Sequence, residues 1–186
     1  GTPRPGWDVW IDREERALVQ ARKDRDPARV MVHQVRLDLL RELVADPWVM
    51  GRIAANHALS DLYACGARPL SALAAVVLPF ASPGLLQRDL EQLLAGALHE
   101  FAAVDCRLGG GHSMQGGELA IGFVVNGQPM RPDGRLLPKR GLAPGDRLLL
   151  TKPLGTGTLF AAHMQRRADG RNIRAAIDMM LVSNGP

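Results

Sequence analysis

The stretch DPWVMGRIAANHALSDLYACG, residues 46–66, contains both ends of a predicted helix. Asp46 can cap the helix with its carboxylate, and Pro47 is favoured at the first helical position. Gly66 can adopt the left-handed conformation that often ends a helix. The stretch therefore predicts a helix from Pro47 to Cys65.

The predicted helix has an apolar face and one acid in its middle. The face is widened by two leucines and consists of Val49, Ile53, His57, Leu59, Leu62 and Ala64. The intervening alanines permit close packing on a sheet. Asp61 lies within the same helix, where burial is costly unless the carboxylate meets a cation or a donor.

Strands and helices alternate on both sides of this helix. Val30–Leu37 predicts a strand upstream, and Pro69–Pro79, apolar on both faces, predicts a strand buried on both sides. Ser82 and Pro83 open a second helix. Further strands are predicted at Cys106–Leu108, Leu119–Val125 and Arg147–Thr151, and further helices at Leu159–Arg167 and Ile173–Val182. This order predicts an α/β (α+β) sandwich with two helices packed on a mixed sheet.

Composition divides the chain and limits its partners. Residues 1–29 form a variable, charged segment, residues 30–150 the main domain, and residues 151–186, too short for a core, the start of a truncated second domain. Aromatic residues make up only 4%, which argues against a nucleic-acid partner despite a net charge of +4. No apolar run has the length of a membrane span. Two isolated cysteines favour a reducing, cytoplasmic location.

Two carboxylates are the first candidates for chemistry. Asp38 ends a predicted strand and Asp61 interrupts an alanine-rich helix. Converging carboxylates suit Mg²⁺ held together with nucleotide phosphates; alternatively, Asp61 reaches solvent or caps another element. His57, one turn before Asp61, is expected to orient the acid or to be a core histidine rather than a metal ligand. Asn56 and Ser60 directly precede His57 and Asp61, are also four positions apart, and could line the same site.

Three further motifs contain residues that could take part in chemistry. Gly109–Ser113 follows a strand, and three glycines can form a nest of backbone N–H groups around a phosphate; a plain glycine-rich turn is equally consistent. Thr151–Gly157 is favoured as a hinge between domains over a phosphate loop. Cys65 and Cys106 have no neighbouring base, so buried packing is expected rather than nucleophilic chemistry.

The whole set of motifs resembles selenophosphate synthetases (selenide, water dikinases). The segment 46–67 resembles their signature helix, and the motifs at 110–113, 144–146, 150–157 and 180–184 follow in the family's order. The resemblance is closest to the form fused to a pyridine nucleotide-disulfide oxidoreductase. It implies the N-terminal domain of the aminoimidazole ribonucleotide synthetase-like fold. It also implies a reaction that converts selenide, ATP and water to selenophosphate, AMP and phosphate. A cytoplasmic homodimer is implied as well, because strands 70–78 and 119–125 would otherwise be left as exposed edges.

The resemblance also assigns roles to residues. Asp61 and Asp38, separated by the family's 23-residue spacing, are implied ligands of Mg²⁺ and ATP, and Glu15 corresponds to a further metal position. The implied nucleotide-contacting residues are Gly110, Gly111, His112 and Ser113. ATP and Mg²⁺ are thus the expected cofactors.

The chain departs from the family pattern near its start. The family's catalytic Cys/Lys loop has no counterpart before Asp38, and Arg16 and Arg36 stand where other residue types are usual. The catalytic residues are therefore unknown, and the chain is expected to be inactive alone. Two alternatives stay open: a degenerate, non-catalytic dimerisation or regulatory module of a fusion protein, and another kinase or synthetase of the superfamily.

Overall fold

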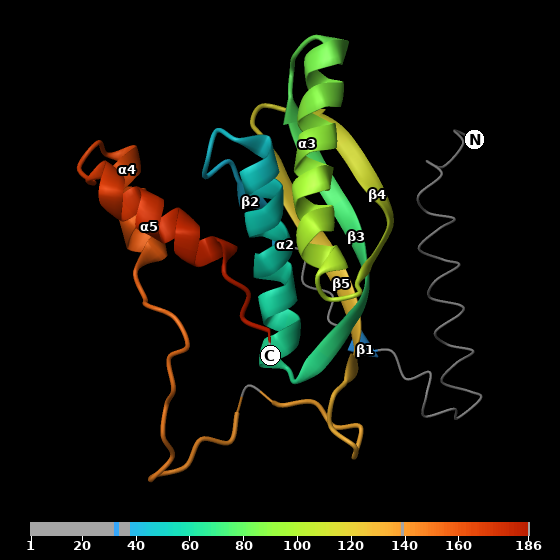
Figure 1. Ribbon diagram of the computed structural model, residues 1–186, viewed down its shortest axis with the longest axis vertical. Coiled ribbons are helices and arrows are strands. Elements are labelled where there is room, and N and C mark those ends of the chain that lie inside the picture. The colour runs from blue at the N-terminus through green and yellow to red at the C-terminus, as the bar shows by residue number, and fades with distance from the viewer. Residues whose placement is uncertain (1–31, 34–37, 139, 186) are drawn as a thin grey trace, which may run out of the picture.

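One mixed β-sheet with helices on one face forms the centre of the molecule (Figure 1). The computed structural model describes residues 32–33, 38–138 and 140–185. In chain order the elements are β1 (Val32–His33), β2 (Leu40–Arg41), α2 (Pro47–Ala64), β3 (Ala67–Pro79), α3 (Pro83–Ala102), β4 (Arg107–Gly116), β5 (Ala120–Pro129), α4 (Thr156–Met164) and α5 (Gly170–Leu181). The predicted α/β sandwich with a mixed sheet is confirmed.

The sheet combines parallel and antiparallel pairing. Its order is β1-β5-β3-β4, and β2 also pairs with β5. The central strand β3 runs parallel to β4 and antiparallel to β5, with Val76 opposite both Ser113 and Ile121. The parallel pair requires a crossover, and α3 provides it.

Helix α2 forms where its end signals predicted it. The Asp46 carboxylate accepts a hydrogen bond of 3.1 Å from the Val49 amide, and Pro47 is the first helical residue. Gly66, with φ of +69°, follows the C-cap residue Cys65. These local interactions satisfy backbone groups that a helix end leaves unpaired, so the helix bounds follow from the sequence.

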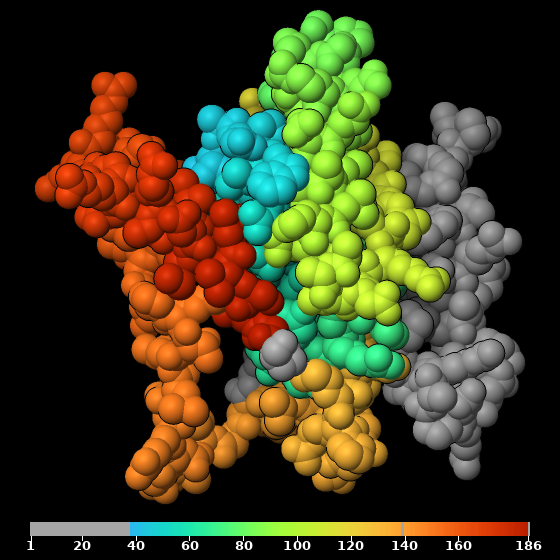
Figure 2. Space-filling model, viewed as in Figure 1, coloured from blue at the N-terminus to red at the C-terminus, as the bar shows by residue number. Residues whose placement is uncertain are grey.

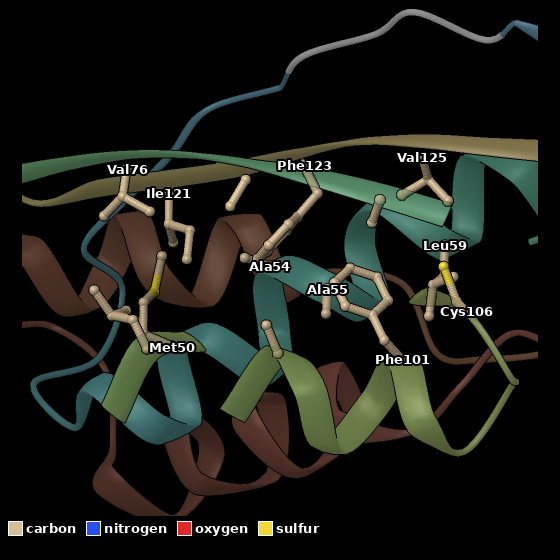
Figure 3. Packing of buried hydrophobic residues seen from close by; sticks show 14 of the residues in the cluster. Met50, Ala54, Ala55, Leu59, Val76, Phe101, Cys106, Ile121, Phe123 and Val125 are labelled. Atoms are coloured by element: carbon tan, nitrogen blue, oxygen red, sulfur yellow. The ribbon is translucent and has the colours of Figure 1, made fainter. Parts of the chain in front are cut away.

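The core lies between the sheet and the helices α2 and α3. Figure 3 shows Val76, Ile121 and Phe123 of the sheet facing Met50, Ala54 and Phe101 of the helices. The rings of Phe101 and Phe123 meet edge to face, with 5.0 Å between centroids and 85° between planes. Burial of this continuous apolar layer is the main stabilising term of the fold.

Two glycines bring α2 and α3 into direct backbone contact. A Cβ added at Gly51 would lie 1.9 Å from the Leu93 carbonyl oxygen, and one at Gly96 would lie 2.0 Å from the Trp48 carbonyl oxygen. No larger residue fits either position without moving a helix. The pair therefore fixes the distance between the two helices.

The predicted apolar face of α2 is partly wrong. Met50, Ala55 and Asn56 are buried, whereas His57 is exposed. The buried side of α2 is shared between the sheet and α3, so it is broader than one stripe and is rotated away from His57.

Two strand predictions also need correction. Arg147–Thr151 forms neither strand nor helix, and Leu149 is 87% exposed, because no described strand pairs with this segment. Of the predicted strand Val30–Leu37, only β1 lies within the described residues.

The sheet edge is not where the sequence placed it. Segments 70–78 and 119–125 were expected to be edge strands that dimerisation would cover. In the structure β3 has neighbours on both sides and β5 pairs with β3, β1 and β2, so both are interior strands. β4 is the outer strand of the described sheet, and most of its residues are exposed.

Helices α4 and α5 pack together beside α2. Their small apolar cluster contains Phe160, Ile173 and Ala176, and it contacts Leu43 and Val44 before α2. Figure 2 shows this pair of helices beside the segment around residue 45. The domain boundary at residue 150 stays a prediction. Among the helices of the described residues, none combines the length and apolarity needed to cross a bilayer.

Candidate functional site

Asp38 and His57 lie together at the surface, near the start of β2. The Asp38 Oδ2 atom is 3.7 Å from the His57 Nε2 atom. Asp38 comes from the segment before β2, and His57 comes from the middle of α2. His57 is therefore exposed and contacts Asp38, so it is not a core histidine, and its expected role in orienting Asp61 stays a prediction.

Asp61 lies one helical turn after His57 on α2, so the two side chains leave the helix on neighbouring positions. It is half-buried. Within the described part of the chain its carboxylate takes part in no hydrogen bond or ion pair. A half-buried carboxylate without a protein partner is stabilised by a cation.

The donors available for a metal fit one particular kind of site. The described residues contain no group of three or more His, Cys, Asp or Glu side chains arranged to hold a metal ion. Mg²⁺ commonly takes only one or two carboxylates and completes its shell with water and substrate phosphates. Asp38 and Asp61 thus fit a nucleotide-bound Mg²⁺ rather than a metal caged by protein alone. Glu15 lies outside the described residues.

The glycine-rich segment Gly109–Ser113 is a strand and not the predicted loop. It lies within β4, and the pairing with β3 skips Gly109 and resumes at Gly110, whose φ is +144°. A Cβ on Gly111 would lie 2.2 Å from the Ala74 carbonyl oxygen. Two of the glycines are thus required by strand pairing itself, and a contact of this segment with nucleotide stays a prediction.

The structure does not join this segment to the two acids. β4 is the outer strand of the described sheet and pairs with β3, and α3 packs over these strands. Helix α2 packs beside α3, and on the sheet it contacts mainly β5 (Figure 1). In the described residues, no hydrogen bond or ion pair connects Gly110–Ser113 with Asp38 or Asp61.

The segment expected to be a hinge, residues 151–157, lies against α2, and its role as a hinge stays a prediction. Lys152 and Thr156 line a hollow together with Asn56, His57 and Ser60. Sequence reasoning placed Asn56 and Ser60 near a site but missed the residues after 150. Their signals in the sequence were a lysine beside a glycine-containing turn and the family motifs at 150–157 and 180–184.

Two side-chain hydrogen bonds attach the end of the chain to α2. The Asn56 amide donates to the Leu181 carbonyl oxygen at 3.1 Å, and the Asn184 amide donates to Ser60 Oγ at 2.7 Å. The motif at 180–184 therefore completes a wall of the hollow beside the acids.

Both cysteines are buried, as the sequence suggested. Burial, and secondarily the neighbouring Asp105, raises the pKa of the Cys106 thiol to about 12. A thiol that stays protonated at neutral pH is a poor nucleophile. Cys106 therefore acts as a core residue.

Comparison with known proteins defines the class to which this fold and site belong. Residues 26–128 match the family described as AIR synthase related protein, N-terminal domain. The chain therefore belongs to this family.

Within the family the sequence is similar to selenide, water dikinases. The enzyme of Geobacter metallireducens is 41% identical over 127 residues, which cover 68% of this chain and 36% of that protein. The enzyme of Nitratidesulfovibrio vulgaris is 39% identical over 154 residues, which cover 80% of this chain and 43% of that protein. The resemblance to selenophosphate synthetases is confirmed, and the chain spans about two fifths of the length of these relatives. The fusion to an oxidoreductase stays a prediction.

Solved structures share the fold at lower sequence identity. Thiamine monophosphate kinase from Aquifex aeolicus matches with a TM-score of 0.63 at 18% identity, covering 88% of this chain and 58% of that one. A related kinase structure, complexed with AMPPCP and TMP, matches with a TM-score of 0.62 at 22% identity, covering 78% of this chain and 47% of that one. The hydrogenase maturation protein HypE matches with a TM-score of 0.57 at 16% identity, covering 74% of this chain and 44% of that one. The predicted fold class is thus confirmed.

Proposed function

We propose that this chain is the ATP- and Mg²⁺-binding portion of a selenophosphate synthetase-like phosphotransferase. The parent protein would convert selenide, ATP and water to selenophosphate, AMP and phosphate. The observation that carries the proposal is the half-buried carboxylate of Asp61, which has no partner among the described residues, with Asp38 beside the neighbouring His57. Sequence identities of 39–41% to selenide, water dikinases favour this reaction over those of the kinases that share only the fold.

The role of the two acids follows from charge. ATP phosphates and two carboxylates repel one another, so they approach only when a cation lies between them. Asp38 and Asp61 would hold Mg²⁺, which supplies charge neutralisation to the phosphates during phosphoryl transfer. His57 would keep the Asp38 side chain turned toward α2 through their contact of 3.7 Å.

We also propose that the protein is a homodimer that joins through its sheet. Leu73, Ala75 and Val77 alternate with core residues along β3, so they form an apolar, half-buried row on the sheet face away from α2. Exposed Met114 of β4 lies in register with Val77 on the same face. A monomer at micromolar concentration in sedimentation velocity would contradict the dimer.

Calorimetric titration of ATP with Mg²⁺ tests the nucleotide site. Asp61→Asn should weaken binding at least about tenfold, because it removes the charge that holds the cation. Glu91→Gln is the matched control, since it removes one negative charge from an exposed position on α3. Equal affinity of wild type and Asp61→Asn would overturn the proposal.

A further inference from the structure

We propose that the hollow beside the acids is a subsite for one small anion, the class to which the phosphate-accepting substrate and inorganic phosphate both belong. This inference rests on the proposed function and adds a second binding position to it. The hollow has a volume of about 190 Å³ and lies between α2, the Lys152–Thr156 turn and the end of α5. In Figure 1 the C-terminal end of the chain lies beside α2.

Lys152 supplies a positive charge that lacks a matching acid. Its ammonium group donates to the Val182 carbonyl oxygen, which uses one of three possible donors. No carboxylate of the described residues pairs with it. Partial burial lowers the pKa of Lys152, a sign that the ammonium group has lost some of its water. A partly desolvated cation without a counter-charge is stabilised by a bound anion.

Neutral donors are placed beside the lysine. Thr156 is the first residue of α4, a helix of nine residues, and its hydroxyl makes no hydrogen bond within the described residues. Its backbone N–H is also one of the groups that the start of a helix leaves unpaired. By contrast, Ser60 Oγ already donates to the Asn56 carbonyl oxygen at 2.6 Å and accepts from Asn184. An anion in the hollow would therefore be bound by Lys152 and Thr156. Ser60 would line the hollow without donating to the anion, because its hydroxyl already donates to Asn56.

Size and lining restrict the anion. Sites for drug-sized ligands begin at about 300 Å³, and a water molecule occupies about 30 Å³, so the hollow has room for about six waters and not for a nucleotide. Met179 and Met180 line its other side. Methionine donates no hydrogen bond, so the donors to a bound anion lie on the side formed by Lys152 and Thr156.

The location links the hollow to the acids. His57 lines the hollow and also contacts Asp38, and Ser60 directly precedes Asp61. A small anion bound here would lie next to phosphates held through Asp38 and Asp61. The hollow is thus suited to the acceptor substrate before transfer or to free phosphate after it.

Anaerobic calorimetry with three salts tests the subsite on the full 186-residue chain. Sodium hydrosulfide stands in for selenide, sodium phosphate tests the second source, and sodium chloride at equal ionic strength measures unspecific binding. Hydrosulfide or phosphate should bind the wild type, and Lys152→Met should weaken that binding about tenfold. Arg174→Gln, which removes one positive charge from an exposed position on α5, should leave it unchanged.

The outcomes separate this inference from the nucleotide site. If Lys152→Met does not fold, judged by circular dichroism, Thr156→Val tests the same hollow and should weaken binding about threefold. Absence of binding by both anions, or equal binding by wild type and variant, overturns the subsite even where ATP still binds. If Asp61→Asn loses ATP binding and still binds the anion, the result supports both sites. If the wild type binds the anion and does not bind ATP, the result refutes only the proposed function.

Discussion

Replacing Gly96 with alanine should push α3 away from α2 and destabilise the domain. The added Cβ would lie 2.0 Å from the Trp48 carbonyl oxygen, and ordinary contact begins at 3.4 Å, so the helices must separate by about 1.4 Å. The obstacle is backbone, which cannot rotate aside. Overpacking of this kind costs about 3 kcal/mol, and the better helix propensity of alanine returns about 1 kcal/mol, which leaves a net loss of about 2 kcal/mol.

Urea denaturation followed by far-UV circular dichroism measures this loss. With a slope of about 2 kcal/mol per molar urea, the midpoint of Gly96→Ala should fall by about 1 M. Gly84→Ala is the matched control on the same helix, because a Cβ there meets nothing within 4 Å. Its midpoint should stay constant or rise. Equal midpoints for the two variants would refute the conclusion that the glycine pair sets the helix spacing.

Three further outcomes are expected. Phe101→Ala should lower the free energy of unfolding by about 3–5 kcal/mol in the same urea assay, because Phe101 is fully buried against Phe123; a loss below about 1 kcal/mol would contradict this packing. The single variant Glu100→Gln should lower the free energy of unfolding more than the double variant Arg52→Met/Glu100→Gln. In the wild type Arg52 Nε lies 2.5 Å from Glu100 Oε1, and the single change leaves the Arg52 charge without this partner. A double variant that is less stable than the single variant would contradict this. Burial raises the pKa of the Cys106 thiol to about 12 in the folded protein, whereas an unfolded thiol has a pKa of about 8.5. The thiol therefore contributes fully to the free energy of unfolding below about pH 8.5, and this contribution falls as the pH rises toward 12. Alkaline titration of wild type and Cys106→Ala measures this, and identical pH profiles would contradict it.

Local signals in the sequence predicted the elements whose ends are determined locally. The bounds of α2 follow from Asp46, Pro47 and Gly66, each of which acts on residues within one turn. The apolar run Pro69–Pro79 likewise predicted the strand β3, although not its place inside the sheet. Such elements can be predicted from the sequence because the residues whose interactions define them lie close together in the chain.

Non-local pairing explains what the sequence did not predict. Three glycines in a row are typical of a turn, but parallel pairing with β3 holds Gly110 and Gly111 in a strand. Arg147–Thr151 has the apolar pattern of a strand and no described partner to pair with. Whether a segment forms a strand depends on the strand that pairs with it, and the sequence of the segment alone does not show which strand that is.

The same distinction applies to the candidate site. Asp38 and Asp61 were found from residue type and spacing, although the contact of Asp38 with His57 depends on how the segment before β2 folds back on α2. Lys152 was assigned to a hinge because its chain neighbours are glycines and a proline. Its position beside Ser60 results from the packing of residues that are 92 positions apart in the sequence, and a local sequence pattern contains no information about such packing.

The long connection between β5 and α4 has a consequence for how the chain responds to proteases. In residues 130–155 the described positions form no helix or strand, and Leu148, Leu149 and Leu150 are exposed. Such a segment is a preferred cleavage site. One cut there would leave α4 and α5 attached to α2 without a covalent link, held by the bonds of Asn56 and Asn184 and by their apolar cluster. The intact connection gives the two pieces a high effective concentration, and cleavage would make their association depend on dilution.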